Sequence, residues 1–506
     1  MNLLIPERII TDPAERMRLA DQQNDDSNYF EASEALCRMY PDSIPLLLQY
    51  IDDCETRNLS TYSSKDIDLF PSSTDVRFIA IAYRTIRYGD TEGIAYPIDK
   101  LDSNLRFQPW LKALKLHLYE TSNEQEIIRL LRKELKRNPN NERAHRLFLR
   151  VANNYSSKLL DSLMCDPNTA RFVTVPEKND YYFTHGHIGL YFSNIITDRF
   201  GSVGWLTLLA SLLVSGVWVV FIRSMDVFNR EKWGPVILVF ITGALFTHLC
   251  LPLYDTAQLV YGLQLNGEAG NDFLYSTLVI GGSEELVKLL PWLLFALLSK
   301  RMREPFDYLL YASVSALGFA FAENLMYLED TGNIVGRTIM SSVGHMFDAS
   351  IIAYAFILSR YRYKQRWAKW LLPIAGFVVA ALAHGFYDFW LISEAVEAYA
   401  FVTTIFFIVS LHVWFFFKNN ALNNSDYFTS HRVYNAGFQQ DLLTFALLGM
   451  LMVEYTFVSL EYGADDGNQI IVHSSYMVFL FLVYVGAWVK IRSVFPAFTS
   501  KESPSR

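Results

Sequence analysis

Ionisable side chains inside hydrophobic segments are the feature of this chain that points to chemistry. Four consecutive segments carry them: residues 273–298, 308–328, 338–358 and 371–392. Their polar residues, in chain order, are Glu284, Glu285 and Lys288, then Glu323 and Asn324, then His345 and Asp348, then His384 and Asp388. Because a charge at the bilayer centre costs about 2.5–3.5 kcal/mol on insertion scales, such residues persist where they pair, line a wet cavity or do chemistry. We interpret them as one polar site shared by neighbouring helices.

Three of these segments hold two polar residues at a spacing that places both on one face of a helix. The pairs are Glu284 with Lys288, His345 with Asp348, and His384 with Asp388. Polar residues on the other hydrophobic segments stand alone, and we interpret them as structural hydrogen-bonding groups: His248, His412, Glu454 and His473.

The composition predicts two parts of different character. The chain has 506 residues and is 51% hydrophobic, which is too apolar for a soluble protein of this size, yet its first half has a soluble pattern. The net charge of −8 gives no reason to expect nucleic-acid binding. The first residues lack the basic region and long apolar run of a cleavable signal peptide, so we expect internal helices to direct membrane insertion.

Residues 1–178 are predicted to form a soluble α-helical domain. Apolar residues recur at helical spacing, and prolines separate the helical stretches: Pro41, Pro71, Pro109 and Pro139. These spacings predict helical hairpins of about tetratricopeptide (TPR) length, and LLRKELKRNPNNERAHRLFLRV resembles the junction between two such repeats. An irregular helical domain without a binding groove fits the pattern as well. Either form is a scaffold or partner-binding module.

Residues 203–495 are predicted to form an all-α polytopic bundle of about nine transmembrane helices. Besides the four polar segments, these helices are 203–222, 234–254, 398–417, 442–460 and 471–489. We expect residues 179–202, which are rich in aromatic side chains, to form an interfacial linker, and residues 496–506 to form a flexible tail.

The charges of the loops predict the orientation of the bundle. Lys and Arg concentrate in the loops 223–233, 299–305, 359–369 and 418–441 and in the tail, whereas the alternate loops hold none and are acidic. By the positive-inside rule the basic loops are cytoplasmic. At 1.5 Å per residue, the polar site then lies in the outer half of the membrane, about 7–16 Å from the outer ends of its segments. The N-terminal domain would lie outside after nine spans, and inside if residues 181–198 also entered the membrane.

The motifs of the four polar segments resemble those of the PrsW family of polytopic membrane proteases. Two stretches are similar to the EExxK and FxxxEN motifs of that family: Glu284-Glu285-Leu286-Val287-Lys288 and Phe319-Ala320-Phe321-Ala322-Glu323-Asn324. His345 with Asp348, and His384 with Asp388, resemble the later histidine-containing helices of the family. The similarity covers residues 281–392, within a predicted protease core of 273–394, and extends more distantly to the CAAX-prenyl and bacteriocin-processing membrane proteases.

The resemblance implies an intramembrane peptidase that cleaves a membrane-anchored protein near the outer membrane face, as PrsW-type proteases cleave anti-sigma factors in stress signalling. It implies a multi-pass protein of the bacterial cytoplasmic (inner) membrane. Its partners would be the lipid bilayer, the substrate and any protein that the N-terminal domain binds. The implied catalytic residues are Glu284, Glu285, Lys288, Glu323, Asn324, His345 and His384, with Asp348 and Asp388 in support.

Hydrolysis inside a membrane needs water, a base to activate it and donors to stabilise the oxyanion. One of the adjacent glutamates is the candidate base, and Lys288 is placed one turn away to pair with a carboxylate. His345, His384 and Glu323 can form a zinc site with an open position for water, although the chain has no HExxH helix. A metal-free mechanism, in which glutamate and histidine bind the water, uses the same residues.

The alternative function is a proton- or ion-coupled membrane transporter, because intramembrane carboxylates and histidines also build proton relays. Many transporters contain internal repeats with broken helices, and the two halves of this bundle show no convincing repeat. A catalytically silent receptor, whose N-terminal domain recruits partners, would leave the polar site without a role.

Overall fold

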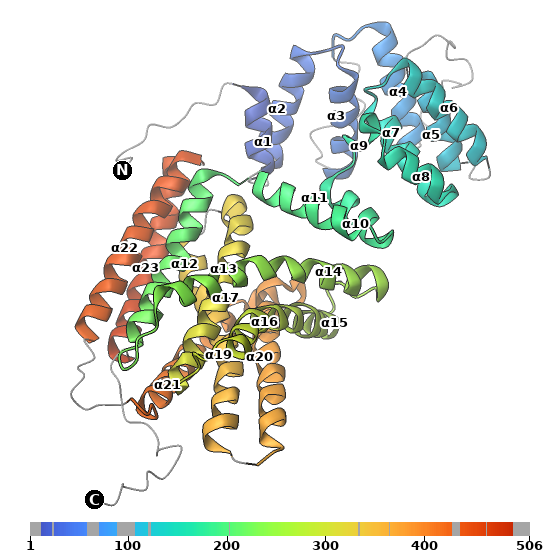
Figure 1. Cartoon of the computed structure of the whole chain (residues 1–506). Coiled ribbons are helices and arrows are strands. Elements are labelled where there is room, and N and C mark those ends of the chain that lie inside the picture. Colours follow the sequence, from blue (N-terminus) through green and yellow to red (C-terminus); the bar gives the residue numbers. More distant parts are fainter. Residues whose placement is uncertain are drawn as a thin grey trace, which may run out of the picture. The chain divides into compact units, whose positions relative to one another are not determined.

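The structure of this chain is a computed structural model, shown in Figure 1. It describes residues 12–22, 25–57, 70–88, 107–119, 123–201, 203–331, 334–363, 365–427, 436–461 and 463–488. Within these ranges the regular elements are helices and no strand is present, which confirms the predicted all-α fold class. The chain divides into two compact units between Lys178 and Asn179. The predicted tail, 496–506, lies outside the described residues.

The N-terminal unit is a series of helices packed in chain order. They are α1 (Pro13–Gln22), α2 (Asp26–Met39), α3 (Ile44–Arg57), α4 (Thr74–Tyr88), α5 (Gln108–Tyr119), α6 (Glu124–Arg137), α7 (Glu142–Tyr155), α8 (Ser157–Met164) and α9 (Pro167–Ala170), and α10 (Val175–Thr184) crosses the boundary to the second unit. From α1 to α9, each helix contacts the next one along the chain, as in helical-repeat proteins. The pairs α2–α3 and α6–α7 each consist of two 14-residue helices. A TPR-like relationship remains a prediction.

The turn between α6 and α7 is closed by a buried glutamate. Glu134 Oε1 accepts hydrogen bonds from Asn138 Nδ2 at 2.8 Å and from Asn141 Nδ2 at 3.0 Å. Asn141 also caps α7, because its side-chain oxygen accepts the backbone N–H of Ala144. These contacts satisfy the two asparagine side chains that a tight, Pro139-containing turn buries between two helices.

The second unit contains the membrane helices. Its elements begin with α11 (Ile188–Gly201), α12 (Trp205–Met225), α13 (Trp233–Phe246), η3 (Thr247–Leu249), α14 (Cys250–Asp255), η4 (Thr256–Val260), α15 (Ala269–Leu274), η5 (Tyr275–Gly281) and α16 (Gly282–Leu298). They continue with α17 (Pro305–Thr331), α18 (Ile334–Gly336), η6 (Arg337–Ser341), α19 (Ser342–Ile357), η7 (Leu358–Arg362), α20 (Ala368–Ile392), η8 (Glu394–Tyr399), α21 (Phe401–Asn423), α22 (Ala436–Glu461) and α23 (Ala464–Trp488).

Eight helices in the described part of this unit are long and apolar enough to cross a membrane. They correspond to eight of the nine predicted segments, so the multi-pass bundle is confirmed. The ninth segment, 273–298, forms η5 and the 17-residue α16 and is not among the eight. The physical reason is composition, because α16 carries the three charged residues of the EExxK motif. It still packs inside the bundle, against α13, α17 and α20.

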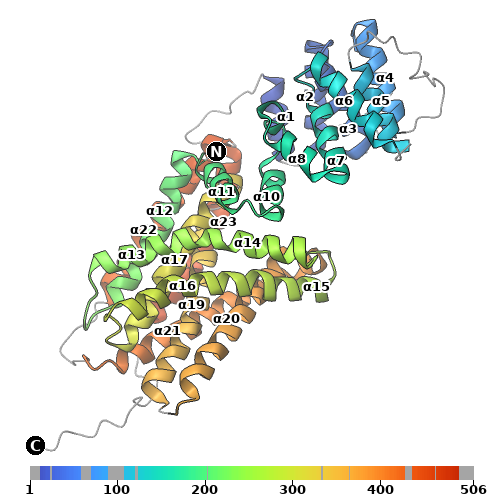
Figure 2. The same ribbon diagram turned by 45° about the vertical axis from the view of Figure 1, so that its right-hand side comes forward.

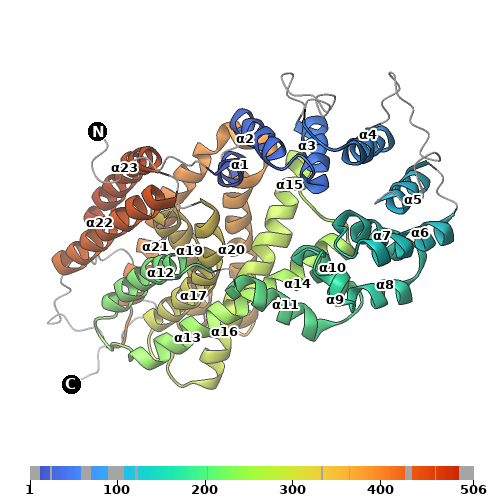
Figure 3. The same cartoon turned by 90° about the horizontal axis from the view of Figure 1, so that it is seen from above.

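Helix α17 lies at the centre of the bundle, and 83% of its most hydrophobic stretch is buried. It packs against α12, α13, α16 and α19, while α19 and α20 form an adjacent pair and α14 runs beside α16 (Figure 2). Seen from above, α22 and α23 lie side by side at the edge of the unit, next to α12 (Figure 3). The polar segments are therefore mutual neighbours, and the segments without the motifs surround them.

Two glycines let η5 and α20 approach backbone to backbone. A Cβ atom on Gly281 would lie 2.4 Å from the carbonyl oxygen of Ala381, and one on Gly385 would lie 2.3 Å from Cα of Thr277. Small residues have this role in membranes, where close van der Waals packing helps to hold helices together. The contact matters for the site because Gly385 directly follows His384 and Gly281 lies one turn before Glu284.

Replacing Gly385 with alanine is expected to lower the stability of the bundle. The added methyl group overlaps backbone atoms of η5, and overpacking of this kind costs about 1–3 kcal/mol. Thermal unfolding of the purified protein in detergent measures the effect. Gly449→Ala in α22 is the matched control, since a Cβ atom there meets nothing within 4 Å. Equal unfolding midpoints for the two variants would contradict the close approach.

Candidate active site

A buried lysine joins three helices at the centre of the site. Lys288 Nζ lies 3.1 Å from Glu284 Oε2 and 2.9 Å from Glu285 Oε1, both on α16. It also lies 2.8 Å from His345 Nδ1 on α19 and 3.2 Å from His384 Nδ1 on α20. The same ammonium stands over the ring of Phe319 on α17, 4.4 Å from its centroid, a favourable cation–π geometry.

The two adjacent glutamates have different surroundings. Glu284 lines a cavity, and its Oε1 accepts a hydrogen bond of 2.9 Å from the hydroxyl of Tyr254 on α14. Glu285 is fully enclosed and does not line the cavity, and its Oε1 lies 2.8 Å from His384 Nδ1. Consecutive residues on a helix point about 100° apart, so one carboxylate faces the cavity while its neighbour faces the bundle.

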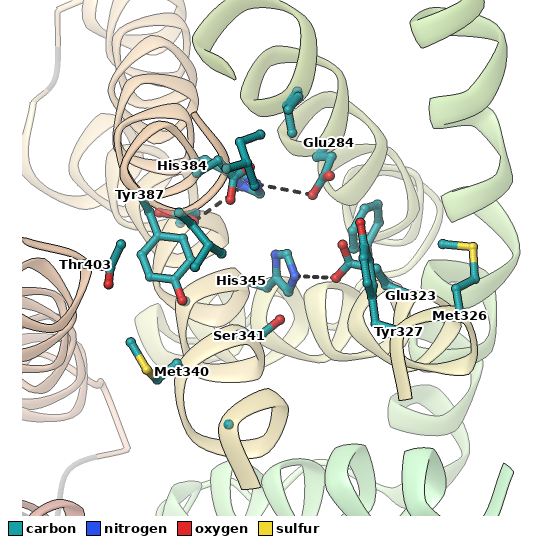
Figure 4. A pocket seen from close by; sticks show the side chains of 18 of the residues that line it. Glu284, Glu323, Met326, Tyr327, Met340, Ser341, His345, His384, Tyr387 and Thr403 are labelled. Atoms are coloured by element: carbon teal, nitrogen blue, oxygen red, sulfur yellow. Dashed lines mark hydrogen bonds and ion pairs between the residues drawn. The ribbon is translucent and has the colours of Figure 1, made fainter. Parts of the chain in front are cut away.

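His384 is surrounded by carboxylates. Besides Glu285, its Nδ1 lies 3.5 Å from Asp348 Oδ2, and its Nε2 lies 3.1 Å from Asp388 Oδ2 and 3.3 Å from Glu284 Oε2. Figure 4 shows His384 and Glu284 in direct contact on the cavity wall. A ring held on both nitrogens by carboxylates has a fixed orientation.

His345 has a different partner from the one that its own helix offers. Its Nε2 lies 2.8 Å from Glu323 Oε2 on α17, and its ring centroid lies 5.5 Å from that of His384 (Figure 4). Asp348, one turn further along α19, lies against His384. Asp348 lies in the site because it shares a face of α19 with His345. It contacts His384 and not His345 because α19 packs on α20.

These residues surround a cavity of about 570 Å³. The predicted site residues on its wall are Glu284, Glu323, His345, Asp348, His384 and Asp388. Glu285, Lys288 and Asn324 are buried behind the wall and do not line it. The predicted residues other than Asn324 thus form one cluster in two layers, with the lysine in the inner one, whereas Asn324 is buried on α17 beside Glu323 in the chain.

Irregular helical turns precede two of the helices that carry predicted site residues. The π-helices η5 and η6 lead directly into α16 and α19, which carry the glutamate pair and His345. Such turns shift side-chain register within a continuous helix and are frequent at functional sites. They place motif residues at angles that regular helices would not give.

The donor set fits a divalent metal. Two groups of three residues offer ligand atoms within 4.8 Å of one another: Glu284 with His345 and His384, and Glu285 with Asp348 and His384. Carboxylate and imidazole are ligands of zinc, and three protein ligands leave a position for water. Glu285 Oε2 and Asp348 Oδ1, both in the second group, are buried oxygens without a hydrogen-bond partner. Glu323, predicted as a ligand, is in neither group and instead contacts His345.

Sequence reasoning missed several residues on the cavity wall. Tyr254 and Cys250 come from α14, Thr403 and Thr404 from α21, and Met477 from α23; His473, also on α23, was assigned a structural role. Single hydroxyl, thiol and thioether groups in apolar segments give no periodic signal, so only the packing of the helices could have identified them.

Part of the chain is similar to proteins of a known family. Residues 231–414 match the family model described as PrsW family intramembrane metalloprotease. The chain is 26% identical to Protease PrsW of Clostridioides difficile (strain 630) over 217 residues, 41% of this chain and 86% of that protein. It is 28% identical to Protease PrsW of Shouchella clausii (strain KSM-K16) over 209 residues, 41% of this chain and 93% of that protein. No solved structure has a significant match.

The predicted recognition is therefore confirmed, and with it the assignment of the enzyme as a protease. The matched segment contains all four polar helices and ends within α21. The N-terminal unit, α22 and α23 lie outside it.

Replacing Lys288 with methionine is expected to destabilise the bundle strongly. The substitution keeps the volume but leaves Glu284 and Glu285 buried without their cation, and breaking a buried pair in this way costs about 3–5 kcal/mol. The free energy of unfolding in detergent, measured on chelator-treated protein, tests this. Lys300→Met, at an exposed position, is the control. Stability of Lys288→Met equal to that of the control would show that the ammonium does not hold the cluster together.

Proposed function

We propose that this chain, which carries a PrsW-family protease domain in residues 231–414, hydrolyses a peptide bond of a membrane-anchored protein with water activated at the Glu284–His345–His384 cluster. The observation that carries the proposal is the convergence of a carboxylate and two imidazoles on one cavity inside a membrane bundle, with an ammonium buried directly behind them. These are the groups that acid–base hydrolysis requires.

Glu284 is the base in this proposal. It is the glutamate on the cavity wall, and its two oxygens are held by Tyr254 and Lys288. It would take a proton from water and deliver it to the leaving amine. Glu285 does not reach the cavity, so it acts through His384, whose ring it orients.

In this proposal, the reacting water and the scissile carbonyl each take the place of one partner that His345 and His384 have in the structure, and the rings then hold the water and polarise the carbonyl. When Lys288 donates to Nδ1 of His345, the ring carries its hydrogen on Nε2 and donates it to Glu323. Asp348 and Asp388 fix His384 from two sides. The result is a preorganised polar site, which stabilises charge that develops in the transition state without reorganisation.

A zinc ion bound by His345 and His384 would supply a Lewis acid for the carbonyl and a more acidic water. Five carboxylates surround Lys288 and the two histidines: Glu284 and Glu285 contact the lysine, Glu323 contacts His345, and Asp348 and Asp388 contact His384. That excess of negative charge favours a bound cation.

The cut is proposed to occur near the outer membrane face. The cavity reaches Tyr327 at the end of one candidate span and Ile392 at the end of another, and both ends lead into acidic loops. The opposite ends of these spans adjoin basic loops, which the positive-inside rule assigns to the cytoplasm. An anti-sigma factor of the bacterial inner membrane is the proposed class of substrate.

Comparing membrane-protein fragments in cells that carry wild-type protein, Glu284→Gln or Glu285→Gln tests the function. Wild-type cells are expected to contain fragments whose new termini lie at the outer end of a transmembrane segment, including one from an anti-sigma factor. Either substitution should reduce these fragments by about 10²–10⁴-fold, the size of an acid–base contribution. Mass spectrometry of the termini gives both the substrate and the position of the cut.

Glu397→Gln in η8 is the control, because that carboxylate is exposed and away from the site. Full cleavage by both single variants at normal abundance would overturn the roles of the glutamates. Termini at the cytoplasmic end would overturn the outer-face assignment. The transporter alternative predicts altered ion flux with an unchanged set of fragments.

Metal content gives an independent prediction. Purified wild-type protein is expected to hold about one zinc ion per chain by elemental analysis, and His345→Ala and His384→Ala should each lose it. Both variants should abolish cleavage, and the double variant should be no worse, because the two rings act as a unit. His412→Ala, at an exposed ring on α21, is the control. Zinc retained in both variants would place the metal elsewhere, and active metal-free protein would leave the glutamate–histidine water mechanism.

A further inference from the structure

A helix outside the family segment forms part of the cavity wall. His473 and Met477 lie on α23, beyond the matched residues 231–414, and both line the cavity that contains the catalytic cluster. They are four residues apart, so they share one face of the helix. His473 is exposed and Met477 is half-buried, and both line the cavity, whereas Val472 and Phe479 are exposed and do not line it. One face of α23 therefore contributes to the wall of the site.

The hairpin of α22 and α23 is attached to the helix that carries His345. The buried carboxylate of Glu454 on α22 accepts a hydrogen bond of 2.8 Å from the backbone N–H of Val335. Val335 lies in α18, which contacts both α22 and α23 and continues through η6 into α19. A carboxylate at the first turn of a helix satisfies an N–H that the helix leaves unpaired. The wall and the catalytic helix are thus held together.

The space between η6, α21 and α23 is suited to an unwound peptide. Met340 and Met477 provide flexible apolar surface, and Ser341, Thr403 and Thr404 provide hydroxyl groups. Peptide cleavage in a membrane requires that the substrate helix open locally, and its freed backbone groups then need partners, because lipid offers none. Methionines adapt to side chains of different shape.

The backbone beside His345 is also open to the cavity. A Cβ atom on Gly344 would meet nothing within 4 Å, and this residue lies on the cavity wall directly before the histidine. A substrate backbone can therefore approach α19 at the position where the reacting carbonyl must lie, close to the imidazole and to Glu284.

We propose that the cavity between η6, α21 and α23 binds the unwound part of the substrate's transmembrane segment, and that Met477 and His473 select the side chains next to the scissile bond. The proposal rests on the proposed protease function and adds the binding site and its specificity to it. The occupant is a transmembrane segment because the cavity lies within the bundle, is continuous with the catalytic cluster and combines apolar walls with hydroxyl groups.

The test uses the full chain in vesicles of phosphatidylethanolamine and phosphatidylglycerol, with single-span reporter peptides that carry either Phe or Ala at the positions flanking the cut. Met477→Trp should narrow the cavity and lower kcat/KM for the Phe reporters by about tenfold, while the Ala reporters change little. Met477→Ala should raise the ratio of kcat/KM for the Phe reporters to kcat/KM for the Ala reporters. His473→Leu should alter this ratio while the Ala reporters are still cleaved. Phe479→Trp, two residues away on an exposed face of α23, is the matched control.

The outcomes separate this proposal from the function on which it rests. If wild-type protein cleaves the reporters and neither Met477 variant changes the Phe-to-Ala ratio, the substrate does not lie against α23, and a lipid chain is the better occupant of that space. If wild-type protein cleaves no reporter, or Glu284→Gln cleaves as well as wild type, the protease function itself fails and the proposal fails with it. A shift in ratio equal to that of Phe479→Trp would also overturn it.

Discussion

The ammonium of Lys288 is the interaction on which the organisation of the membrane unit depends. It contacts two glutamates of its own helix and one histidine each from α19 and α20. In a bilayer none of these groups can be left without a partner, because the cost of an unpaired buried charge is several kcal/mol. Few other arrangements of these helices would leave every buried charge paired. The need to pair these charges therefore makes the geometry of the site specific.

Close backbone contact is the second condition for this arrangement. Water is absent around the helices, so burial of apolar surface does not drive them together as it does in a soluble protein. Gly281 and Gly385 remove the side chains that would keep η5 and α20 apart. Gly243 and Gly318 do the same between α13 and α17, where a Cβ atom would lie within 2.3 Å of a backbone oxygen of the facing helix. Packing and chemistry are therefore coupled, since the glycines bring the glutamates and His384 within hydrogen-bonding distance.

The membrane unit combines a segment that matches the family model with helices outside it, α11 and α12 before it and the α22–α23 hairpin after it. The core, residues 231–414, contains every motif residue, whereas α22 and α23 supply Glu454, His473 and Met477 from outside it. Substitutions in a cluster of buried, paired charges leave a charge without its partner. Substitutions on a part of the cavity wall that does not contact the cluster leave those pairs intact. An added helix pair at the edge of the core is thus a physical route to a new substrate preference with an unchanged catalytic centre.

The sequence by itself determined which motif residues share a helix face, because helical periodicity and the cost of charge in lipid mark the four polar segments. It also determined the all-α fold, the multi-pass bundle and the family, through motifs such as Glu284-Glu285-Leu286-Val287-Lys288. Only the tertiary structure decided which side chains meet. Asp348 lies against His384 and not against His345 of its own helix, Tyr254 holds Glu284, and Glu454 joins α22 to α18. The reason is physical: periodicity fixes the faces within one helix, whereas partners across helices depend on helix order, crossing angle and the register shifts of η5 and η6, which no local pattern encodes.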